Sequence, residues 1–528
     1  MQKSATVLDQ IASLQKESAA EGIKRITFEW TKGLITGVND LEVGNLGGVL
    51  DCNGLVAKKR EIERTRGLVS FCTTTVTGNP IGIYQHIDLD GDRTLFLLTT
   101  SYLYVLTAGA WVVASTGTYV GDEDYKPSFD SWQDNMLFTS FNDTVKLWTA
   151  ATGAVTALNA FGGVTTKAGC MALFKTRLIL GMLDENGTKS PWRVKWSQVG
   201  TYSSFTGVGS GFQDLLETPG PVLTMQTILD KLFVFKTDSI WECIYVGSPN
   251  VFIIVPVVTG VGLSAKATVD VITGAGGNAE AVIFLGNDDV YIFDGRTATP
   301  IGGEFIQKYI FGANSIIDPG YRGRSIGKYI KEDKQYWLSV PLTGLTYPNV
   351  TLIYDFLTSS WWKVSLGVPL RCMGESIKSG SLTWNAVLGT WDDSAANWDD
   401  AYLAEGAIKV IVGSGTTPTY EIDFASSMVA GSVPSAYLET PDQMYEAETR
   451  WLQFSVELKG SDGATLFYSK DEGANWISLG TKAGHASLYK VVDWYMNFTT
   501  EKTRFKLELG SNTTAIRKNK GFITLRTV

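Results

Sequence analysis

A hairpin that recurs along the chain constrains the fold more than any other feature of this sequence. Each copy has an apolar strand, a short polar turn and a second strand rich in aromatic and β-branched residues, which is the pattern of a β-hairpin. The clearest copies lie at residues 95–105, 136–148, 232–244 and 282–293, and weaker ones at 178–196 and 336–354. The copies are separated by roughly 40 to 55 residues, which is the length of a four-stranded propeller blade.

The repeat predicts an all-β fold with a β-propeller-like domain over residues 26–430, and about six to eight blades fit in that length. The composition agrees, because hydrophobic residues make up 44% of the chain, charged residues make up 19%, and 55 glycines are available for tight turns. Two stacked β-sandwiches also contain short strands and turns, but they do not readily repeat one hairpin at this period.

Both ends of the chain differ from the repeat region. Residues 1–25 place apolar side chains at helical spacing before Gly22, which predicts a short amphipathic arm that either serves assembly or packs on its own domain. At the other end, a linker-like stretch at 431–435 precedes regular apolar and polar alternation, as at 452–458. We therefore expect residues 431–528 to form a separate C-terminal β-sandwich that folds independently.

The charge and cysteine patterns argue against several classes of protein. The formal net charge is −9 and the basic cluster at 58–60 is short, so tight tracking of nucleic-acid phosphates is not indicated. Five widely spaced cysteines fit neither a disulfide framework nor a zinc site, and we expect buried thiols in a reducing cytoplasm. No stretch has the form of a signal peptide or the apolar length of a membrane-spanning helix, so we expect neither export nor membrane insertion.

Residue types for catalysis are scarce. The only two histidines, His86 and His485, lie in different expected domains, which leaves no material for a histidine-based triad or a multi-histidine metal site. The chain also lacks a P-loop, a GxSxG elbow and a dinucleotide-binding fingerprint in the required context. The sequence therefore predicts a non-enzymatic protein with no cofactor, while a carboxylate pair for glycoside hydrolysis stays open as the alternative.

Two acidic segments resemble parts of calcium sites. A doubled Trp-Asp-Asp motif has oxygen ligands that could bind calcium, but its spacing is irregular, which favours a solvated loop held by its tryptophans. Its carboxylates belong to Asp392, Asp393, Asp399 and Asp400. Residues 88–92 imitate the start of a calcium loop without the downstream glutamate, which favours a turn between strands. We therefore predict no metal site.

One segment in the expected sandwich resembles the Asp-box of sialidases and related β-proteins. Residues 469–476 read Ser-Lys-Asp-Glu-Gly-Ala-Asn-Trp. In that motif the aspartate binds turn amides, the glycine permits the tight turn and the tryptophan packs beneath, so the motif holds a hairpin and carries out no chemistry. The residues expected in these structural roles are Ser469, Asp471, Gly473 and Trp476.

Several stretches resemble the β-propeller tail hub, nozzle or packaged-DNA stabilisation proteins of short-tailed bacteriophages. Residues 53–68 contain a strand that leads to an Arg-Gly turn, and residues 81–84 lead into the first hairpin. Residues 336–362 contain a Leu-Ile-Tyr-Asp strand followed by tryptophans, and residues 196–205 contain a further similar element. The Arg-Gly turn departs from the Pro-Gly form expected for the family.

The resemblance implies a structural virion protein of the tail, assembled in the host bacterial cytoplasm. It implies a homo-hexameric ring that extends the portal and adaptor rings, contacts tail fibre or spike proteins, retains packaged DNA and lets it pass on ejection. An acidic chain suits a channel in which DNA slides without tight binding. A propeller's own axis is filled or too narrow for duplex DNA, so we expect the channel between subunits. The alternatives are a receptor-binding or polysaccharide-cleaving tail component and a cellular propeller that binds proteins.

Overall fold

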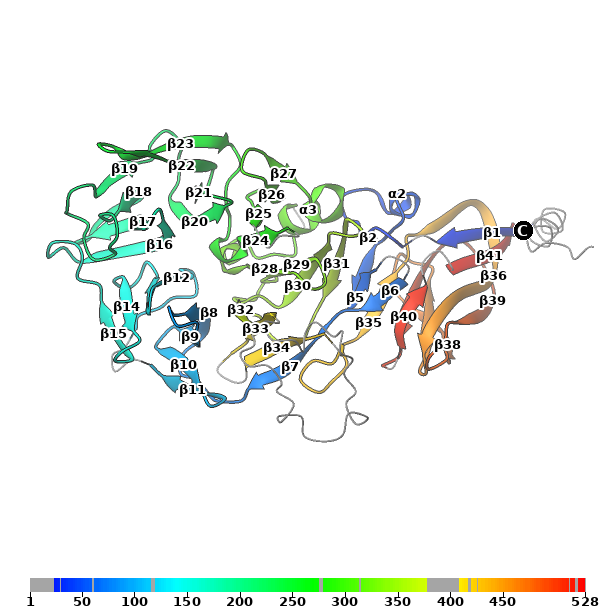
Figure 1. Ribbon diagram of the computed structural model, residues 1–528. Helices are drawn as coiled ribbons and strands as arrows, with labels where there is room; N and C mark the ends of the chain where they lie inside the picture. Colours follow the sequence, from blue (N-terminus) through cyan, green and yellow to red (C-terminus); the bar gives the residue numbers. More distant parts are fainter. Residues whose placement is uncertain are drawn as a thin grey trace, which may run out of the picture.

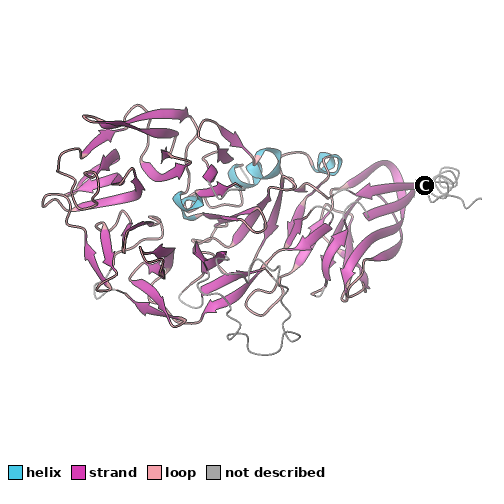
Figure 2. Ribbon diagram, viewed as in Figure 1, coloured by secondary structure: helices cyan, strands magenta, loops and turns pink. Residues whose placement is uncertain are grey.

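The computed structural model describes residues 23–527, apart from 29, 59–60, 115–118, 275–278, 313–314, 378–407, 416–418, 425, 512 and 518–520. The described part of the chain is nearly all β and forms two adjoining units (Figure 1). A ring of sheets occupies one end of the molecule and a second β-unit the other, with helices α2 (Asp40–Asn45) and α3 (Gly303–Phe311) near the junction (Figure 2). The predicted all-β, propeller-like fold is confirmed. Of the helical arm expected at residues 1–25, residues 1–22 lie outside the described residues, and residues 23–25 belong to a β-strand instead of a helix.

Six antiparallel four-stranded sheets form blades of the propeller. The first three blades contain β8 (Pro80–Ile87), β9 (Arg93–Thr99), β10 (Leu103–Thr107) and β11 (Ala110–Val113); β12 (Ser128–Trp132), β13 (Asn135–Thr139), β14 (Lys146–Thr149) and β15 (Ala154–Ala157); and β16 (Thr166–Phe174), β17 (Arg177–Glu185), β18 (Thr188–Trp196) and β19 (Gly211–Asp214). The other three contain β20 (Val222–Ile228), β21 (Lys231–Lys236), β22 (Ser239–Gly247) and β23 (Val251–Thr259); β24 (Asp270–Thr273), β25 (Ala279–Leu285), β26 (Val290–Phe293) and β27 (Ala298–Pro300); and β32 (Cys372–Ile377), β33 (Ile408–Gly413), β34 (Thr419–Asp423) and β7 (Gly67–Cys72).

A six-stranded sheet takes the remaining place in the ring, between the β24–β27 blade and the β32 blade. It contains β28 (Ile326–Ile330), β29 (Gln335–Val340), β30 (Val350–Asp355) and β31 (Ser360–Val364), extended in parallel by β2 (Gly33–Leu34) and β3 (Gly48–Val49). Each sheet packs against the next around the ring, and β32 packs back against β8. The ring is also closed through β7, which comes from the N-terminal part of the chain and pairs with β34.

The strongest predicted hairpins are the two middle strands of four blades, β9–β10, β13–β14, β21–β22 and β25–β26. Their aromatic side chains fill the space between neighbouring blades. Phe235 packs edge-on against Phe284 with ring centroids 5.5 Å apart, and Phe233 packs against Phe293 at 5.0 Å. The middle strands are covered on both faces, which explains why they read as nearly continuous apolar runs.

The second unit is an eleven-stranded, nearly closed, barrel-like sheet. Seven strands follow the propeller: β35 (Ala436–Glu439), β36 (Gln443–Gly460), β37 (Ala464–Ser469), β38 (Ile477–Lys482), β39 (Lys490–Leu509), β40 (Thr513–Arg517) and β41 (Gly521–Thr527). The other four precede it: β1 (Ile23–Phe28), β4 (Asp51–Asn53), β5 (Leu55–Ala57) and β6 (Glu61–Arg64). The long strands β36 and β39 pair with each other and carry the sheet around the core.

The expected boundaries after residues 25 and 430 therefore do not separate the two units. β1 pairs with β41, β4 with β35 and β6 with β40, so strands from the start of the chain belong to the C-terminal sheet. The C-terminal strands leave sheet edges whose backbone groups need partners, and the N-terminal strands supply them. Alternation after residue 430 reveals strands but not which distant strands pair with them.

One buried core runs through both units. It contains Trp337 and Trp361 of the six-stranded sheet together with Trp451 and Phe454 of the barrel-like unit. Polar contacts also cross the junction, because Asp333, in the turn between β28 and β29, accepts hydrogen bonds from residues near β6. The two units are thus joined by a shared core as well as by the chain.

Helices are short and few in the described part of the chain. They are α2 (Asp40–Asn45), α3 (Gly303–Phe311), η1 (Lys266–Thr268) and η2 (Arg322–Arg324). None of these is long and apolar enough to cross a membrane. All five cysteines are buried and free, as the sequence predicts.

Candidate functional site at the propeller axis

The innermost strands of the propeller surround a small cavity at the axis. Its volume is about 210 Å³, and β8, β12, β20, β24, β28 and β32 line it together with the segments ahead of β12 and β24. The lining residues with polar side chains are Lys126, Ser128, Thr224, Gln226, Lys266, Asp270 and Lys328. The cavity wall therefore contains three lysines and one carboxylate.

Glycines on the innermost strands allow neighbouring blades to approach one another closely at the propeller axis. A Cβ at Gly82 of β8 would lie 2.5 Å from Pro127 and 2.7 Å from the ring of Phe129. A Cβ at Gly374 of β32 would lie 2.7 Å from Ile83. These contacts are too short for any side chain, so the inner strands converge only because glycine stands at these positions.

Lys266 crosses the axis. It lies in η1, ahead of β24, and its Nζ donates hydrogen bonds to the carbonyl of Lys126 at 2.7 Å and of Gly169 in β16 at 2.6 Å. These acceptors belong to blades on the far side of the ring. Burial lowers the pKa of Lys266 to about 8, because desolvation disfavours its charged form.

Lys126 links blades that are not adjacent. Its side chain is buried, and its Nζ donates a hydrogen bond of 3.0 Å to the carbonyl of Arg371, just ahead of β32. Burial also lowers the pKa of Lys126. Lys126 and Lys266 together place two ammonium groups and their aliphatic stems inside the ring, so the bore through the propeller is obstructed.

Lys328 of β28 has a different environment. Its Nζ lies 3.0 Å from Asp270 of β24 and 2.8 Å from Glu375 of β32, so it forms ion pairs with both neighbouring blades. Burial alone lowers the pKa of Lys328, but the two carboxylates outweigh burial and hold the pKa above its usual value. Asp270 additionally accepts a hydrogen bond from the backbone N–H of Tyr329 at 2.6 Å.

A second charged cluster lies in the loop ahead of Lys126. The carboxylate of Glu123 accepts hydrogen bonds from Arg371 and, at 2.9 Å, from Arg324. Arg324 also contacts Asp124 at 2.5 Å. The carboxylate of Glu123 is thus shared by two guanidinium groups.

The axial cavity presents cationic donors and neutral polar groups. Its carboxylate, Asp270, is already ion-paired with Lys328, and the buried thiol of Cys372 also lines the cavity. Across the described residues, no group of three or more histidine, cysteine or carboxylate side chains could hold a metal ion. The cavity thus combines ammonium donors with hydroxyl and amide groups.

The two histidines have unrelated environments. His86 of β8 is buried, and its Nδ1 lies 2.8 Å from the Oγ of Ser131 in β12, while its Nε2 has no hydrogen-bond partner in the described structure. Burial lowers the pKa of His86, which favours the neutral ring. The nearby Asp130 accepts the backbone N–H groups of Ser131 and Leu173 and does not orient the imidazole. His485 is exposed.

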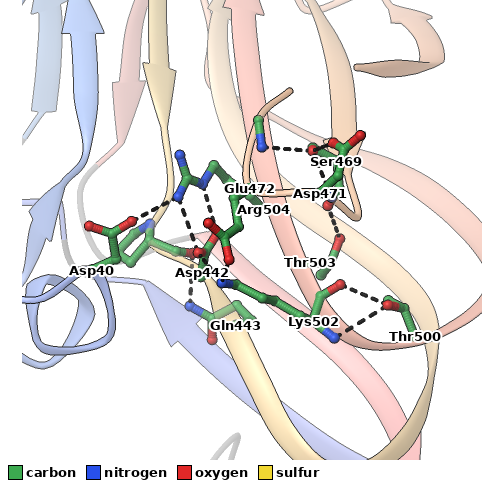
Figure 3. Close-up of polar contacts among 12 residues, drawn as sticks. Asp40, Asp442, Gln443, Ser469, Asp471, Glu472, Thr500, Lys502, Thr503 and Arg504 are labelled. Atoms are coloured by element: carbon green, nitrogen blue, oxygen red, sulfur yellow. Dashed lines mark hydrogen bonds and ion pairs between the residues drawn. The ribbon is translucent and has the colours of Figure 1, made fainter. Parts of the chain in front are cut away.

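The Asp-box-like segment forms the turn between β37 and β38 (Figure 3). Ser469 donates to Asp471 at 2.7 Å and accepts the N–H of Gly473 at 2.9 Å, where the backbone has φ +92°. Asp471 accepts the backbone N–H of Asn475 at 2.9 Å and its side-chain N–H at 2.6 Å. Trp476 is half-buried beside this turn. Asp471 thus serves as a hydrogen-bond acceptor in the turn, and Gly473 supplies its positive φ.

A charged network beside this turn was not apparent in the sequence (Figure 3). Arg504 of β39 binds both oxygens of Asp442, at 2.7 and 3.1 Å, and contacts Asp40 of α2 at 2.9 Å. Lys502 contacts Asp442 at 3.0 Å and Glu472 at 2.6 Å. The one available signal is that Lys502 and Arg504 stand two residues apart on one strand face.

The structure describes only one of the two acidic segments. Asp392, Asp393, Asp399 and Asp400 lie outside the described residues. The 88–92 segment is the turn between β8 and β9, in which Asp88 accepts the N–H of Asp92 at 2.8 Å, as the sequence predicts.

A second cavity, of about 360 Å³, lies where the propeller meets the barrel-like unit. Glu61 and Glu63 of β6 line it, and their carboxyl groups hydrogen-bond to each other. Burial, and then this contact with Glu61, raises the pKa of Glu63. Glycoside hydrolysis needs two carboxyl groups that flank the scissile bond, whereas Glu61 and Glu63 stand two residues apart on one face of a single strand.

The described part of the chain is therefore a closed β-propeller joined to a barrel-like β-unit, and lysines line the cavity at the propeller axis. No protein-family model and no curated protein sequence matches the chain. Among solved structures it is similar to BamB from Moraxella catarrhalis, at 11% identity over 76% of this chain and 97% of that chain, with a TM-score of 0.36. It is also similar to the computationally designed Ika8 protein, at 9% identity over 67% of this chain and 99% of that one, with a TM-score of 0.34.

A third similar structure is the extracellular domain of the putative hybrid two component system BT3049 from B. thetaiotaomicron. The identity is 11% over 82% of this chain, with a TM-score of 0.37, and the chain spans 49% of that protein's length. At TM-scores below 0.5 these similarities carry no argument about function.

Proposed function

We propose that the chain is a structural protein of a short phage tail, in which several copies form a ring around the path of DNA. The proposal begins from the family resemblance of residues 53–68, 81–84, 196–205 and 336–362. In this role the ring extends the portal and adaptor, contacts fibre or spike proteins and lets DNA pass without tight binding.

The main observation that supports a ring of several subunits is that the propeller axis is obstructed. The stems of Lys126 and Lys266 cross the bore, and the space left is about 210 Å³. A DNA duplex cannot pass through such a cavity, so a chain that encloses DNA does so between subunits. Ring closure follows when one heterologous interface repeats around an axis.

Two apolar surfaces at opposite ends of the molecule suit such a head-to-tail contact. Phe212 of β19 and Ile253 of β23, the outer strands of two neighbouring blades, are exposed, as is Ile244 of the adjoining β22. On the barrel-like unit, Val491 and Tyr495 of β39 are exposed, and Tyr495 has 75% of its surface accessible. β19 and β23 lie away from β39 in Figure 1. Exposed apolar clusters of this kind favour contact with another protein surface, here a second copy of the chain.

The alternative of a polysaccharide-cleaving component is less well supported. Its carboxylate pair would be Glu61 and Glu63, and these bind each other instead of facing across a cleft. The ring therefore remains the favoured function.

Electron cryomicroscopy of the purified protein and of virion tails tests the proposal. We expect a closed ring, with six copies as the resemblance implies and a lumen that is net acidic. Ile253→Asp and Tyr495→Asp should each yield monomers, whereas Leu89→Asp, at the exposed turn between β8 and β9 and in neither surface, should leave the ring intact. A monomeric appendage on the outside of the tail, or a bore lined mainly by lysine and arginine, would contradict the proposal.

A further inference from the structure

We infer that the axial cavity is a binding site for a small oxyanion, held by the ammonium groups of Lys126 and Lys266. The inference concerns the inside of one propeller and goes beyond the proposed ring. It rests on the charges around the cavity, on the hydrogen-bond donors its lysines retain, and on the space available.

Within the described residues, two of the three cavity lysines form no direct ion pair with a carboxylate, and Glu123 acts on Lys126 only from a longer distance. Lys328 is ion-paired with Asp270 and Glu375. In the described structure, by contrast, the hydrogen bonds of Lys126 and Lys266 go to backbone carbonyls. A buried ammonium group is costly unless an opposite charge compensates it. Carbonyl dipoles supply part of that compensation, and an anion in the cavity supplies the rest.

The donor count separates these lysines from another buried lysine in the same propeller. An ammonium group has three N–H donors. Lys236 of β21 is fully buried, and its Nζ lies 2.7 Å from the carbonyl of Leu215 and 2.6 and 3.1 Å from the carbonyl and hydroxyl of Thr218. Lys266 makes two such bonds and Lys126 makes one. Lys126 and Lys266 therefore keep N–H donors for a ligand, whereas all three N–H donors of Lys236 already have acceptors.

The rest of the cavity suits an oxyanion. Ser128, Thr224 and Gln226 line it and can donate to further ligand oxygens. Most of the negative charge near the cavity is already paired, because Asp270 and Glu375 share Lys328 and Glu123 is shared by two arginines. A volume of about 210 Å³ equals roughly seven water molecules at about 30 Å³ each, which accommodates phosphate or a small dicarboxylate.

Calorimetric titration of the full chain with inorganic phosphate, against sodium chloride at matched ionic strength, tests the inference. We expect saturable binding at one site per chain. Lys126→Met and Lys266→Met should each weaken binding by about tenfold or more, because each removes a charge-assisted hydrogen bond. Lys236→Met is the matched control and should keep the wild-type affinity, since Lys236 does not line the cavity.

Malonate in place of phosphate defines the ligand class. Binding of phosphate alone identifies a phosphate site and binding of both a general oxyanion site, and each result supports the inference. Absence of saturable phosphate and malonate binding by the wild-type protein overturns it, as does wild-type affinity in both cavity variants or an equal loss in Lys236→Met. If the cavity variants do not fold, tungstate density in the axial cavity of the wild-type protein decides, and an empty cavity overturns the inference.

Discussion

The propeller and the barrel-like unit use similar strands, but their pairing partners lie at very different distances along the chain. Most blades are meanders in which each strand pairs with the next one in sequence. In the barrel-like unit, by contrast, β1 at residues 23–28 pairs with β41 at 521–527. A local pairing leaves a recurring pattern in the sequence, whereas a pairing between the two ends of the chain leaves none. The same distance makes the barrel-like unit dependent on chain segments outside residues 431–528.

Expression of residues 431–528 alone tests most directly whether the barrel-like unit depends on strands from the start of the chain. We expect the fragment to be insoluble or to unfold without cooperativity, because it lacks β1, β4, β5 and β6 and exposes the edges that they cover. Solubility and thermal unfolding followed by circular dichroism measure this. Co-expression of residues 20–66 should restore a cooperative transition, and the same peptide with Ile62→Asp, at a fully buried position, should not. Cooperative unfolding of the fragment alone would show that the N-terminal strands are dispensable.

Removing one core tryptophan from each unit tests whether the shared core makes them one cooperative body. Trp337→Ala in the propeller and Trp451→Ala in the barrel-like unit should each lower the free energy of unfolding by about 3–5 kcal/mol. Both side chains are almost fully buried in one continuous core, so we expect both variants to shift a single calorimetric transition. The partly exposed Trp192 is the control, and its replacement by alanine should cost far less. Separate transitions in either variant would show that the units unfold independently.

Asp442→Asn tests the charged network that belongs to the barrel-like unit. The side chain of Asp442 is 2% exposed. Replacing its carboxylate by an amide removes the negative charge that Arg504 and Lys502 share. We expect a loss of about 1.5–3 kcal/mol at neutral pH. Denaturant titration measures this, with Asp90→Asn in an exposed turn as the control.

The pH dependence of this loss has a defined sign. Burial raises the pKa of Asp442, but hydrogen bonds from Arg504 and Lys502 outweigh burial and hold the pKa below its ordinary value. The stabilisation is therefore complete above the unfolded pKa of about 3.9 and is lost as the pH falls through the lower folded value. The difference between the wild-type protein and Asp442→Asn should shrink in that acid range. If the difference in free energy of unfolding between the two proteins did not change with pH, the charge of the Asp442 carboxylate would not be the source of the stabilisation.

The sequence predicts those parts of the molecule that depend on neighbours in the chain. The hairpin around Leu97 and Tyr104 and the turn from Ser469 to Trp476 could be read because strand, turn and strand follow one another. The pairing of β1 with β41 could not be read, because alternation shows that a strand has a buried face but not which strand lies beside it.

The axial site was missed for a related reason. Lys126, Lys266 and Lys328 are separated by long stretches of chain, and each stands next to apolar residues as an ordinary turn or strand lysine does. Only the closed ring brings them to one cavity and buries them. A lysine directly ahead of an innermost strand is a weak signal, because the order of strands within a blade must be known before the signal can be used.

The smallest expected effect concerns the turn between β37 and β38, a local feature inside the non-local unit. Asp471→Ala removes the acceptor of the Asn475 backbone N–H, so hydrogen exchange of that amide should accelerate. The global unfolding midpoint should stay almost unchanged, because Asp471 is exposed. Amide exchange by NMR measures the effect. Asp471→Asn keeps a side-chain acceptor and should retain most of the protection.

The pH dependence of this turn also has a defined sign. Hydrogen bonds from the Asn475 side chain, and then from Ser469, lower the pKa of Asp471 to about 2. The carboxylate therefore stays ionised well below the ordinary pKa of about 3.9, and its contribution is lost only as the pH falls through about 2. Protection of the Asn475 amide, corrected for the intrinsic exchange rate, should persist at pH 3. Loss of protection already near pH 4, or unchanged exchange in Asp471→Ala, would show that the β37–β38 ladder alone holds this turn.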